Sequence, residues 1–310
     1  MTNLEWLLRN DPVLVHLTKK YLLEQPSETQ NQGLIQRYLE LIDPRSLKWG
    51  NGYYGPKWIS THYTCMELKY MEIDPNTSLY KEALLGYLDH EWEKSIQKYG
   101  IDTMDLCITG MLINMLAYAN IEDPRLNQMI DYTLTRTMPD GAWNCTWHRK
   151  PKPHISSVHT TVNVLEGLAE YLLQGYSYRA EEVKSAFHRG VQVLMARQLI
   201  YIKNTDTPIH PDMADHHYPA RWKYDYLRVL ELLARAKVPY QKEMEPALSV
   251  LKGHLKNGKL SKGKTLSGLT HFKLETETYG RFNTFRAYIV LKEYCPELFA
   301  SCIAEEYKSI

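Results

Sequence analysis

Two nine-residue segments of the chain share one pattern: Ser157-Val158-His159-Thr160-Thr161-Val162-Asn163-Val164-Leu165 and Ser60-Thr61-His62-Tyr63-Thr64-Cys65-Met66-Glu67-Leu68. Each begins with serine, has a histidine two positions later and a leucine six residues after the histidine. A serine before apolar residues spaced at about 3.6 positions is typical of a helix N-terminus. Similar starts recur near Asp105, Tyr224 and Asn283, at steps of 43 to 65 residues. This recurrence predicts a repeat of helical units.

The length of one step predicts the structure of the unit. A step of 43 to 65 residues holds two helices of ordinary length and their connections, so each unit is expected to be a helical hairpin. Three pairs, Asp11-Pro12, Asp74-Pro75 and Asp123-Pro124, are typical of the N-cap and the first residue of a helix. Few segments alternate apolar and polar residues as strands do. We therefore predict an all-α fold.

Hairpins that repeat along a chain bury their faces by stacking, either in an open solenoid or in a closed ring. We expect closure into an α/α toroid, a double ring of helical hairpins that forms one domain over residues 1–310, with residues 1–45 as a cap or a sixth helical unit. In such a fold every inner helix begins at the same end of the ring. The residues at the helix starts are therefore expected to converge around one mouth.

Composition and charge exclude several classes of protein. The 310 residues are 44% hydrophobic and 24% charged, which predicts a packed globular chain. The net charge is +1 and no basic run is long enough to follow a phosphate backbone, so nucleic acid is not expected as a partner. We expect no membrane span, and the start lacks a secretory signal, which favours a cytoplasmic protein. The five cysteines are scattered and odd in number, which leaves metal binding or burial for them rather than disulfides.

The strongest candidate for a functional site combines Asp105, Cys107 and His159, because a carboxylate, a thiolate and an imidazole are side chains that zinc accepts. Asp105 and Cys107 can reach one ion only at a helix start, where the repeat places them and where the thiolate is favoured. Cys145 is a candidate fourth ligand. With it the site would be closed and structural, and without it one coordination position stays open for catalysis. The structural alternative is a helix cap, a buried cysteine and a first-turn histidine.

The sequence around these residues resembles a known family. Asp105-Leu106-Cys107 with Gly110, and His159 followed by Leu165-Glu166-Gly167-Leu168, are similar to the zinc-binding segments of protein prenyltransferase β subunits. These belong to a superfamily with the squalene and hopene cyclases. The resemblance covers residues 58–168 and implies an α/α toroid with a zinc held at the Asp, Cys and His positions. It also implies a partner protein, because those β subunits work with a helical-repeat α subunit.

A second polar cluster lies in residues 210–222. Asp215 with His216 or His217 could act as a catalytic acid–base pair, and Arg221 could bind an anionic group such as a diphosphate. The structural alternative is a polar loop that only meets solvent.

Aromatic residues that carry a polar group are in excess, since 23 Tyr and 7 Trp stand beside 5 Phe. Such side chains suit the wall of a cavity that is apolar in its body and wet at its edge, although Tyr in place of Phe at half-buried positions is the plainer explanation. The candidate substrate-binding residues are Tyr54, Trp58, His62, Trp143, Trp147, Tyr218, Arg221 and Trp222.

The sequence leaves three functions open. The first is a zinc-binding toroid enzyme, similar to a transferase, that takes an apolar or isoprenoid substrate into an aromatic cavity where zinc activates a nucleophile. The second is a metal-independent terpenoid cyclase. The Asp-x-Asp-Asp acid of the protonating cyclases is absent from this sequence, so Asp212 or Asp215 would have to supply the proton. The third is a binding module without catalysis, in which a structural zinc braces the helices.

Overall fold

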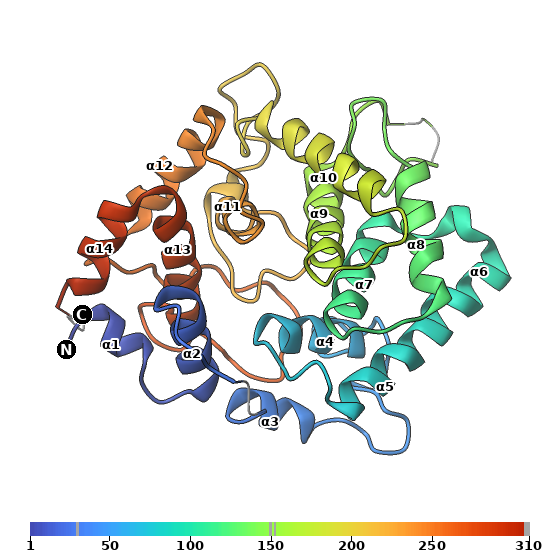
Figure 1. Cartoon of the computed structure of the whole chain (residues 1–310), viewed down its shortest axis with the longest axis horizontal. Coiled ribbons are helices and arrows are strands. Elements are labelled where there is room, and N and C mark those ends of the chain that lie inside the picture. Colours follow the sequence, from blue (N-terminus) through green and yellow to red (C-terminus); the bar gives the residue numbers. More distant parts are fainter. Residues whose placement is uncertain (29–30, 149–150, 152, 307–310) are drawn as a thin grey trace. The chain divides into compact units, whose positions relative to one another are not determined.

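The computed structural model of the protein describes residues 1–28, 31–148, 151 and 153–306 (Figure 1). In this part of the chain the regular structure is helical, and β pairing is limited to isolated bridges such as Thr2 with Glu306. The predicted all-α fold is confirmed. The chain divides into two compact units, of which unit 1 is Met1–Glu40, Tyr70–Asp74 and Ala196–Ile310, and unit 2 is Leu41–Lys69 and Pro75–Met195. The closure of hairpins into a toroid stays a prediction.

Unit 2 carries all four residues expected to bind zinc. Its helices, in chain order, are α4 (Thr61–Tyr70), α5 (Ser78–Tyr87), the π-helical turn Leu88–Glu93, α6 (Lys94–Tyr99), the 3-10 turn Ile101–Thr103, α7 (Leu106–Tyr118), α8 (Pro124–Thr135), α9 (Val158–Leu173) and α10 (Ala180–Met195). Tyr70, the last residue of α4, belongs to unit 1.

Unit 1 is built from both ends of the chain. Its helices are α1 (Asn3–Leu7), α2 (Pro12–Leu17), the π-helical turn Thr18–Leu22, α3 (Leu34–Leu39), the 3-10 turns Pro211–Ala214 and Lys242–Met244, α11 (Tyr226–Arg235), α12 (Glu245–His254), α13 (Arg281–Tyr294) and α14 (Pro296–Ala304). None of the helices in the described ranges combines the length and the apolar character that a bilayer crossing requires.

Most of the predicted helix starts are confirmed. The Ser157 hydroxyl caps α9 by accepting a hydrogen bond from the Thr160 N–H, and α7 begins directly after Asp105. Asp11 and Asp123 cap α2 and α8, each with proline as the first helical residue. The prediction for Asp74-Pro75 is wrong, because α5 begins at Ser78. The Asp74 N–H instead donates to the Asn31 side chain at 2.9 Å, within a turn of unit 1.

The backbones of α7 and α9 touch each other directly. A Cβ atom added to Gly110 would lie 2.6 Å from the Asn163 carbonyl oxygen and from the Val164 Cα, and one added to Gly167 would lie 2.3 Å from the Gly110 carbonyl oxygen. The contacts advance in the same direction along both helices, which lie side by side in Figure 1. The helices are therefore parallel, and their first turns lie at the same end of unit 2.

In unit 1 an ion pair connects α11 to α13. The Arg286 guanidinium on α13 lies 2.6 Å from the Glu231 carboxylate on α11, and it also donates to the His217 carbonyl at 2.9 Å. Arg235 pairs with the other oxygen of Glu231 at 2.9 Å. Burial raises the pKa of Glu231, but the two guanidinium groups outweigh it and lower that pKa overall. Glu231 is thus ionised and forms ion pairs with Arg235 and Arg286.

Replacing Gly110 by alanine tests the α7–α9 contact. We expect Gly110→Ala to lower the free energy of unfolding by about 1–3 kcal/mol or more, because a methyl group has no room against a backbone. Gly253→Ala is the matched control, since Gly253 also lies in a helix but nothing surrounds its missing Cβ within 4 Å. The control should be neutral or slightly stabilising. Urea denaturation followed by circular dichroism measures both, and equal effects would refute the close contact.

Removing one charge of the α11–α13 pair tests the second contact. Glu231→Gln leaves two arginines facing a neutral group, so we expect a loss of about 3–5 kcal/mol of stability. Glu293→Gln breaks the surface pair with Lys237, which has the same 2.6 Å separation, and should cost less than about 1 kcal/mol. The same denaturation experiment distinguishes them; a small effect in both variants would mean that the buried pair does not hold unit 1 together.

Candidate functional site

Two cysteine side chains meet between the first turns of α7 and α9. Cys107 is the second residue of α7, where backbone N–H groups have no partner within the helix. Its N–H donates to the Cys145 Sγ at 3.0 Å. The Thr160 hydroxyl, in the first turn of α9, donates to the same sulfur at 3.3 Å. The Cys145 N–H in turn donates to the Thr160 oxygen at 3.2 Å, which fixes the loop to α9.

The two thiols titrate in opposite directions. A hydrogen bond from the Cys107 thiol lowers the pKa of Cys145, the Thr160 hydroxyl and the Cys107 N–H lower it further, and burial acts against them. The pKa of Cys107 is raised by that same bond, by burial and by the charge of Asp105. Cys145 is thus the more acidic member of the pair, and Cys107 is the donor.

Asp105 sits at the N-cap position of α7, but its side chain does not cap the helix. Its backbone carbonyl instead accepts from the Thr109 N–H and hydroxyl, at 2.9 and 3.0 Å. The Asp105 carboxylate is close enough for its charge to raise the pKa of both thiols. Three of the four residues expected to bind zinc, Asp105, Cys107 and Cys145, therefore lie close together.

His159 lies in the first turn of α9 and is half-buried. The α9 residue that hydrogen-bonds to Cys145 is its sequence neighbour Thr160. In the described part of the chain no three side chains of His, Cys, Asp or Glu are arranged to hold a metal ion together. In the structure Cys107 therefore contacts Cys145, and Asp105 lies near both. The first turn of α9, which contains His159, lies beside them.

An aromatic cluster adjoins the two thiols. We define it as Tyr54, Trp58, His62, Tyr63 and Tyr87, all in unit 2. The ring of His62 lies 5.2 Å from that of Tyr54, 4.8 Å from that of Tyr63 and 5.4 Å from that of Tyr87. Trp58 packs edge-on against Tyr63 at 4.7 Å. Burial raises the pKa of Tyr54, the hydrogen bond with Tyr63 opposes the rise, and the electrostatic effect of Cys107, Asp105 and Cys145 adds to it, so Tyr54 is a cluster member close to the thiols.

His62 is the most unusual member of this cluster. Its side chain is fully buried, and neither ring nitrogen has a hydrogen-bond partner among the residues that the structure describes. Burial, and secondarily the charge of Lys57, lowers its pKa to about 3, so the ring is neutral. The buried Tyr87 hydroxyl likewise has no partner within the described ranges. Buried polar groups are nearly always paired, so His62 and Tyr87 are two polar side chains that the described residues leave available to a ligand.

The two other tryptophans expected at the wall have different surroundings. Trp143 is fully buried and its ring N–H donates to the Thr133 carbonyl at 2.9 Å, which makes it part of the core of unit 2. Trp147 is half-buried beneath the Arg136 guanidinium, 4.6 Å from its ring. Sequence reasoning missed Thr160 as a partner of the thiols. It could have been found from its place in the same first turn as His159.

The cluster of residues 210–222 belongs to unit 1, and the structure gives its members partners other than those expected. Asp215 pairs with Lys264 at 2.6 Å, and His216 contacts the Tyr226 hydroxyl at 3.0 Å. The partner of His217 is the fully buried Asp225, at 3.2 Å, which also caps α11. Burial lowers the pKa of His216 to about 4. Asp215 therefore lies in a surface ion pair, and the histidine–acid pair is His217 with Asp225.

The remaining candidates in this cluster are mostly packed. Tyr218 stacks on Phe282 with ring centres 4.3 Å apart, Arg221 is buried, and Trp222 is half-buried. A hydrogen bond from Lys264 lowers the pKa of Asp212, which favours its ionised form rather than the protonated form that a cyclase acid needs.

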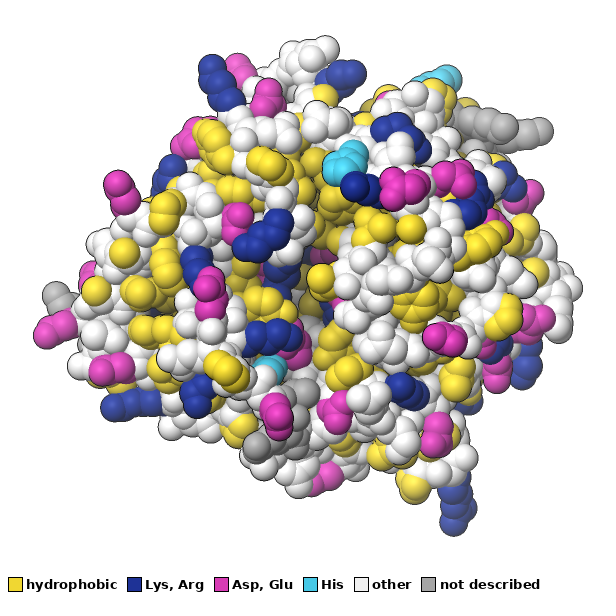
Figure 2. Space-filling view, in the orientation of Figure 1, with side chains coloured by type: hydrophobic (Ala, Val, Ile, Leu, Met, Phe, Trp, Pro, Cys, Tyr) yellow, Lys and Arg dark blue, Asp and Glu magenta, His cyan; other side chains and the backbone are white. Residues whose placement is uncertain are grey.

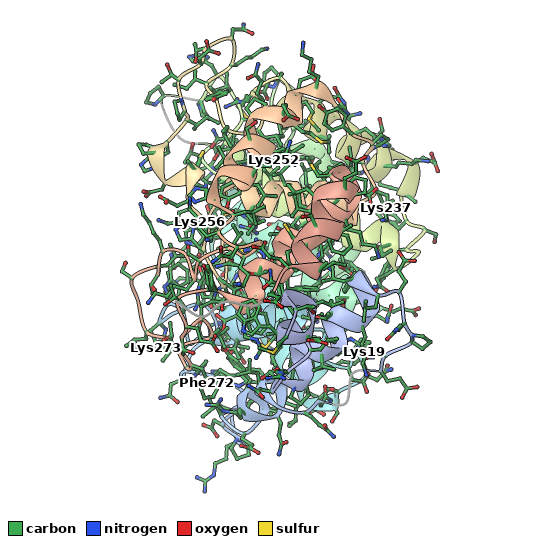
Figure 3. The ribbon with its side chains drawn as sticks, turned by 90° about the vertical axis from the view of Figure 1, so that its left-hand side faces the viewer. Lys19, Lys237, Lys252, Lys256, Phe272 and Lys273 are labelled. Carbon is green, nitrogen blue, oxygen red and sulfur yellow. The ribbon has the colours of Figure 1, made fainter. Side chains whose placement is uncertain are left out.

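On the face of the described chain that Figure 2 shows, positive charges are interspersed with negative ones. Lys237, Lys252, Lys256 and Lys273 are spread apart over unit 1 in Figure 3, and charges of both signs mix over the face in Figure 2. Within the lysine-rich segment, Lys252 pairs with Glu245 at 3.1 Å, and Lys259 is buried against the Asn3 side chain at 3.0 Å.

The thiol pair and the aromatic cluster are thus the part of the chain where chemistry-bearing residues converge in unit 2. Comparison with known proteins assigns no family to them: no protein-family model matches the chain, and no curated protein is significantly similar to it.

Proposed function

We propose that the protein is a zinc-binding enzyme of the α/α toroid type that acts on an apolar or isoprenoid substrate. The observation that carries the proposal is the contact of Cys107 with the Cys145 sulfur at the joint start of α7 and α9, close to the Asp105 carboxylate. The resemblance to protein prenyltransferase β subunits favours the same residues. It also favours a partner protein for the chain.

The donors fit zinc in their chemistry. Thiolates and carboxylates are ordinary zinc ligands. The pKa of Cys145 is lowered toward the thiolate form that a metal requires, whereas that of Cys107 is raised, contrary to the expectation from its place at a helix start. Asp105, Cys107 and His159 from the start of α9 would hold the ion and leave one coordination position open to substrate, whereas Cys145 is the candidate fourth ligand that would close the site. When bound, zinc supplies a Lewis acid that lowers the pKa of a coordinated substrate thiol or hydroxyl.

The residues of the aromatic cluster would bind the substrate. Tyr54, Trp58 and Tyr63 offer ring faces and edges to an apolar chain, and such faces also stabilise a developing positive charge. His62 and Tyr87 offer two buried polar groups to one polar atom of the substrate. Tyr54 borders both the cluster and the thiols, so a substrate seated there would reach the metal with its polar end.

Zinc content tests the metal site. We expect about one equivalent of zinc in the purified wild-type protein, and a loss of most of it in Cys107→Ala, because a missing thiolate removes a strong ligand. Cys295→Ala is the control, since Cys295 is a half-buried cysteine of unit 1. Inductively coupled plasma mass spectrometry provides the measurement. Zinc absent from the wild type, or unchanged in Cys107→Ala, would contradict the proposal.

Cys145→Ala then decides the ligand set. If Cys145 binds the ion, this variant loses zinc as Cys107→Ala does. If it retains zinc, the ligands are Asp105, Cys107 and His159, which leaves one position open to substrate.

Replacing His62 separates a functional role of the aromatic cluster from a structural one. We expect His62→Phe to keep or raise the melting temperature, because an unpaired buried polar group is replaced by an apolar ring. The same variant should lose turnover of linear polyprenyl diphosphates, measured as product formation with and without a chelator. His188→Phe, the same substitution at an exposed position of α10 in unit 2, is the control and should leave both the melting temperature and turnover unchanged. A large fall in the melting temperature of His62→Phe would show that the ring is structural.

A further inference from the structure

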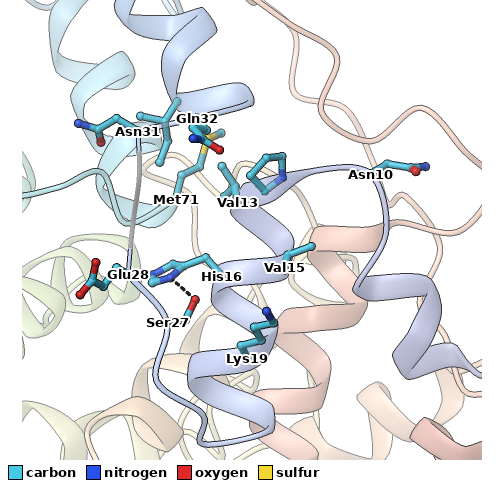
Figure 4. Close-up of a pocket in the computed structure, with 12 residues that line it drawn as sticks. Asn10, Val13, Val15, His16, Lys19, Ser27, Glu28, Asn31, Gln32 and Met71 are labelled. Carbon is cyan, nitrogen blue, oxygen red and sulfur yellow. Dashed lines mark hydrogen bonds between the residues drawn. The ribbon is translucent and has the colours of Figure 1, made fainter.

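A pocket of about 360 Å³ opens in unit 1, beside α2. Its volume is within the range of small-molecule sites, roughly 300–1,000 Å³. Apolar side chains form part of its lining, including Val13, Val15 and Met71. Polar groups from α2 and from the loop that follows line the rest, as Figure 4 shows.

Three residues at this pocket form a hydrogen-bonded chain. The His16 Nδ1 lies 3.0 Å from the Ser27 Oγ, and the His16 Nε2 lies 3.0 Å from the Glu72 carboxylate. His16 is buried on α2, and Ser27 is half-buried in the loop after Leu22. Figure 4 shows the Ser27 and His16 side chains facing each other at the pocket wall. A hydroxyl, an imidazole and a carboxylate in this order are the elements of an activated serine.

The surroundings of Glu72 fix the roles of the two ring nitrogens. Burial would raise the pKa of Glu72, but the bond to His16 and the charge of Lys20, 2.7 Å away, hold it at about 2. The Tyr21 hydroxyl also donates to this carboxylate. Because an ionised carboxylate only accepts, the His16 Nε2 carries the proton. In the neutral ring Nδ1 is then the acceptor, and the Ser27 hydroxyl donates to it.

We propose that Ser27 and His16, positioned by Glu72, form a catalytic site in unit 1 that hydrolyses small carboxylic esters. Ser27 Oγ bonds to the ester carbonyl carbon while its proton passes to His16 Nδ1. The bond from that carbon to the alcohol oxygen breaks, and the alcohol leaves with the proton from His16. Water then attacks the acyl-serine, giving up a proton to the ring, and the carboxylic acid leaves as Ser27 recovers its proton. The net reaction consumes one ester and one water.

Lys19 supplies the charge that this reaction needs. It lies one helical turn after His16, on the same side of the continuous helical stretch, and it lines the pocket. Its ammonium group is the positive charge nearest in sequence to the base and stabilises the oxyanion that forms on the carbonyl oxygen. The site is distinct from the proposed zinc site, because every residue named here belongs to unit 1.

A fluorophosphonate probe and p-nitrophenyl butyrate test this proposal on the full chain. We expect one probe molecule per protein, mapped to Ser27 by peptide mass spectrometry, and no adduct in Ser27→Ala. Ser249→Ala, an exposed serine of α12 in the same unit, should react like the wild type. The absence of an adduct in the folded wild type, or an adduct on another residue, overturns the proposal.

Further variants separate catalysis from packing. His16→Gln should slow the labelling by about 100-fold or more, since the general base is lost. Lys19→Met, at a half-buried position, should lower kcat for the ester by about 10–100-fold with an unchanged melting temperature. Glu72→Gln should lower kcat and leave KM unchanged, a split that a merely structural role does not give. Unchanged labelling and hydrolysis in His16→Gln and Lys19→Met would show that Ser27 is not activated.

Discussion

The direct contact between the backbones of α7 and α9 is the constraint on which unit 2 depends. Gly110 and Gly167 remove the side chains that would separate the two helices, and the helices run parallel as a result. Parallel neighbours bring their N-termini to the same end. Cys107 and Thr160 each lie in such a first turn, so the sulfur of Cys145 receives a donor from both helices at once. Without the close approach, the loop that carries Cys145 would meet only one of them.

Buried anions in this protein are stabilised in two different ways. Glu231 and Glu72 face arginine or lysine side chains, so their charges are balanced within the fold. The donors to Cys145 are a thiol, a backbone N–H and a hydroxyl, all of which are neutral, and the nearby Asp105 adds a second negative charge. Neutral donors stabilise an anion without cancelling its field. The charge of a Cys145 thiolate would therefore not be cancelled by these three donors.

The sequence predicts local features well and tertiary partners poorly. The all-α fold and the capped starts of α2, α8 and α9 follow from patterns within a few residues, and the structure confirms them. Asp74-Pro75 carries the same local signal without a helix, because a side chain 43 positions away competes for its backbone. The pairing of His217 with Asp225 was missed for a related reason, since the predicted partner Asp215 is held by Lys264. His16, Ser27 and Glu72 are separated by up to 56 positions, and no spacing rule joins them.

The histidines of the two units show how burial and pairing together distinguish roles. His217 is buried, and its ring contacts the Asp225 carboxylate, which also caps α11. This contact gives His217 a structural role. His62 is also buried, yet among the described residues neither of its ring nitrogens has a hydrogen-bond partner. A fold gains nothing from hiding an imidazole without partners, and the desolvation costs about 1–3 kcal/mol. The ligand proposed for the aromatic cluster, with one polar end and an apolar body, would offset this cost.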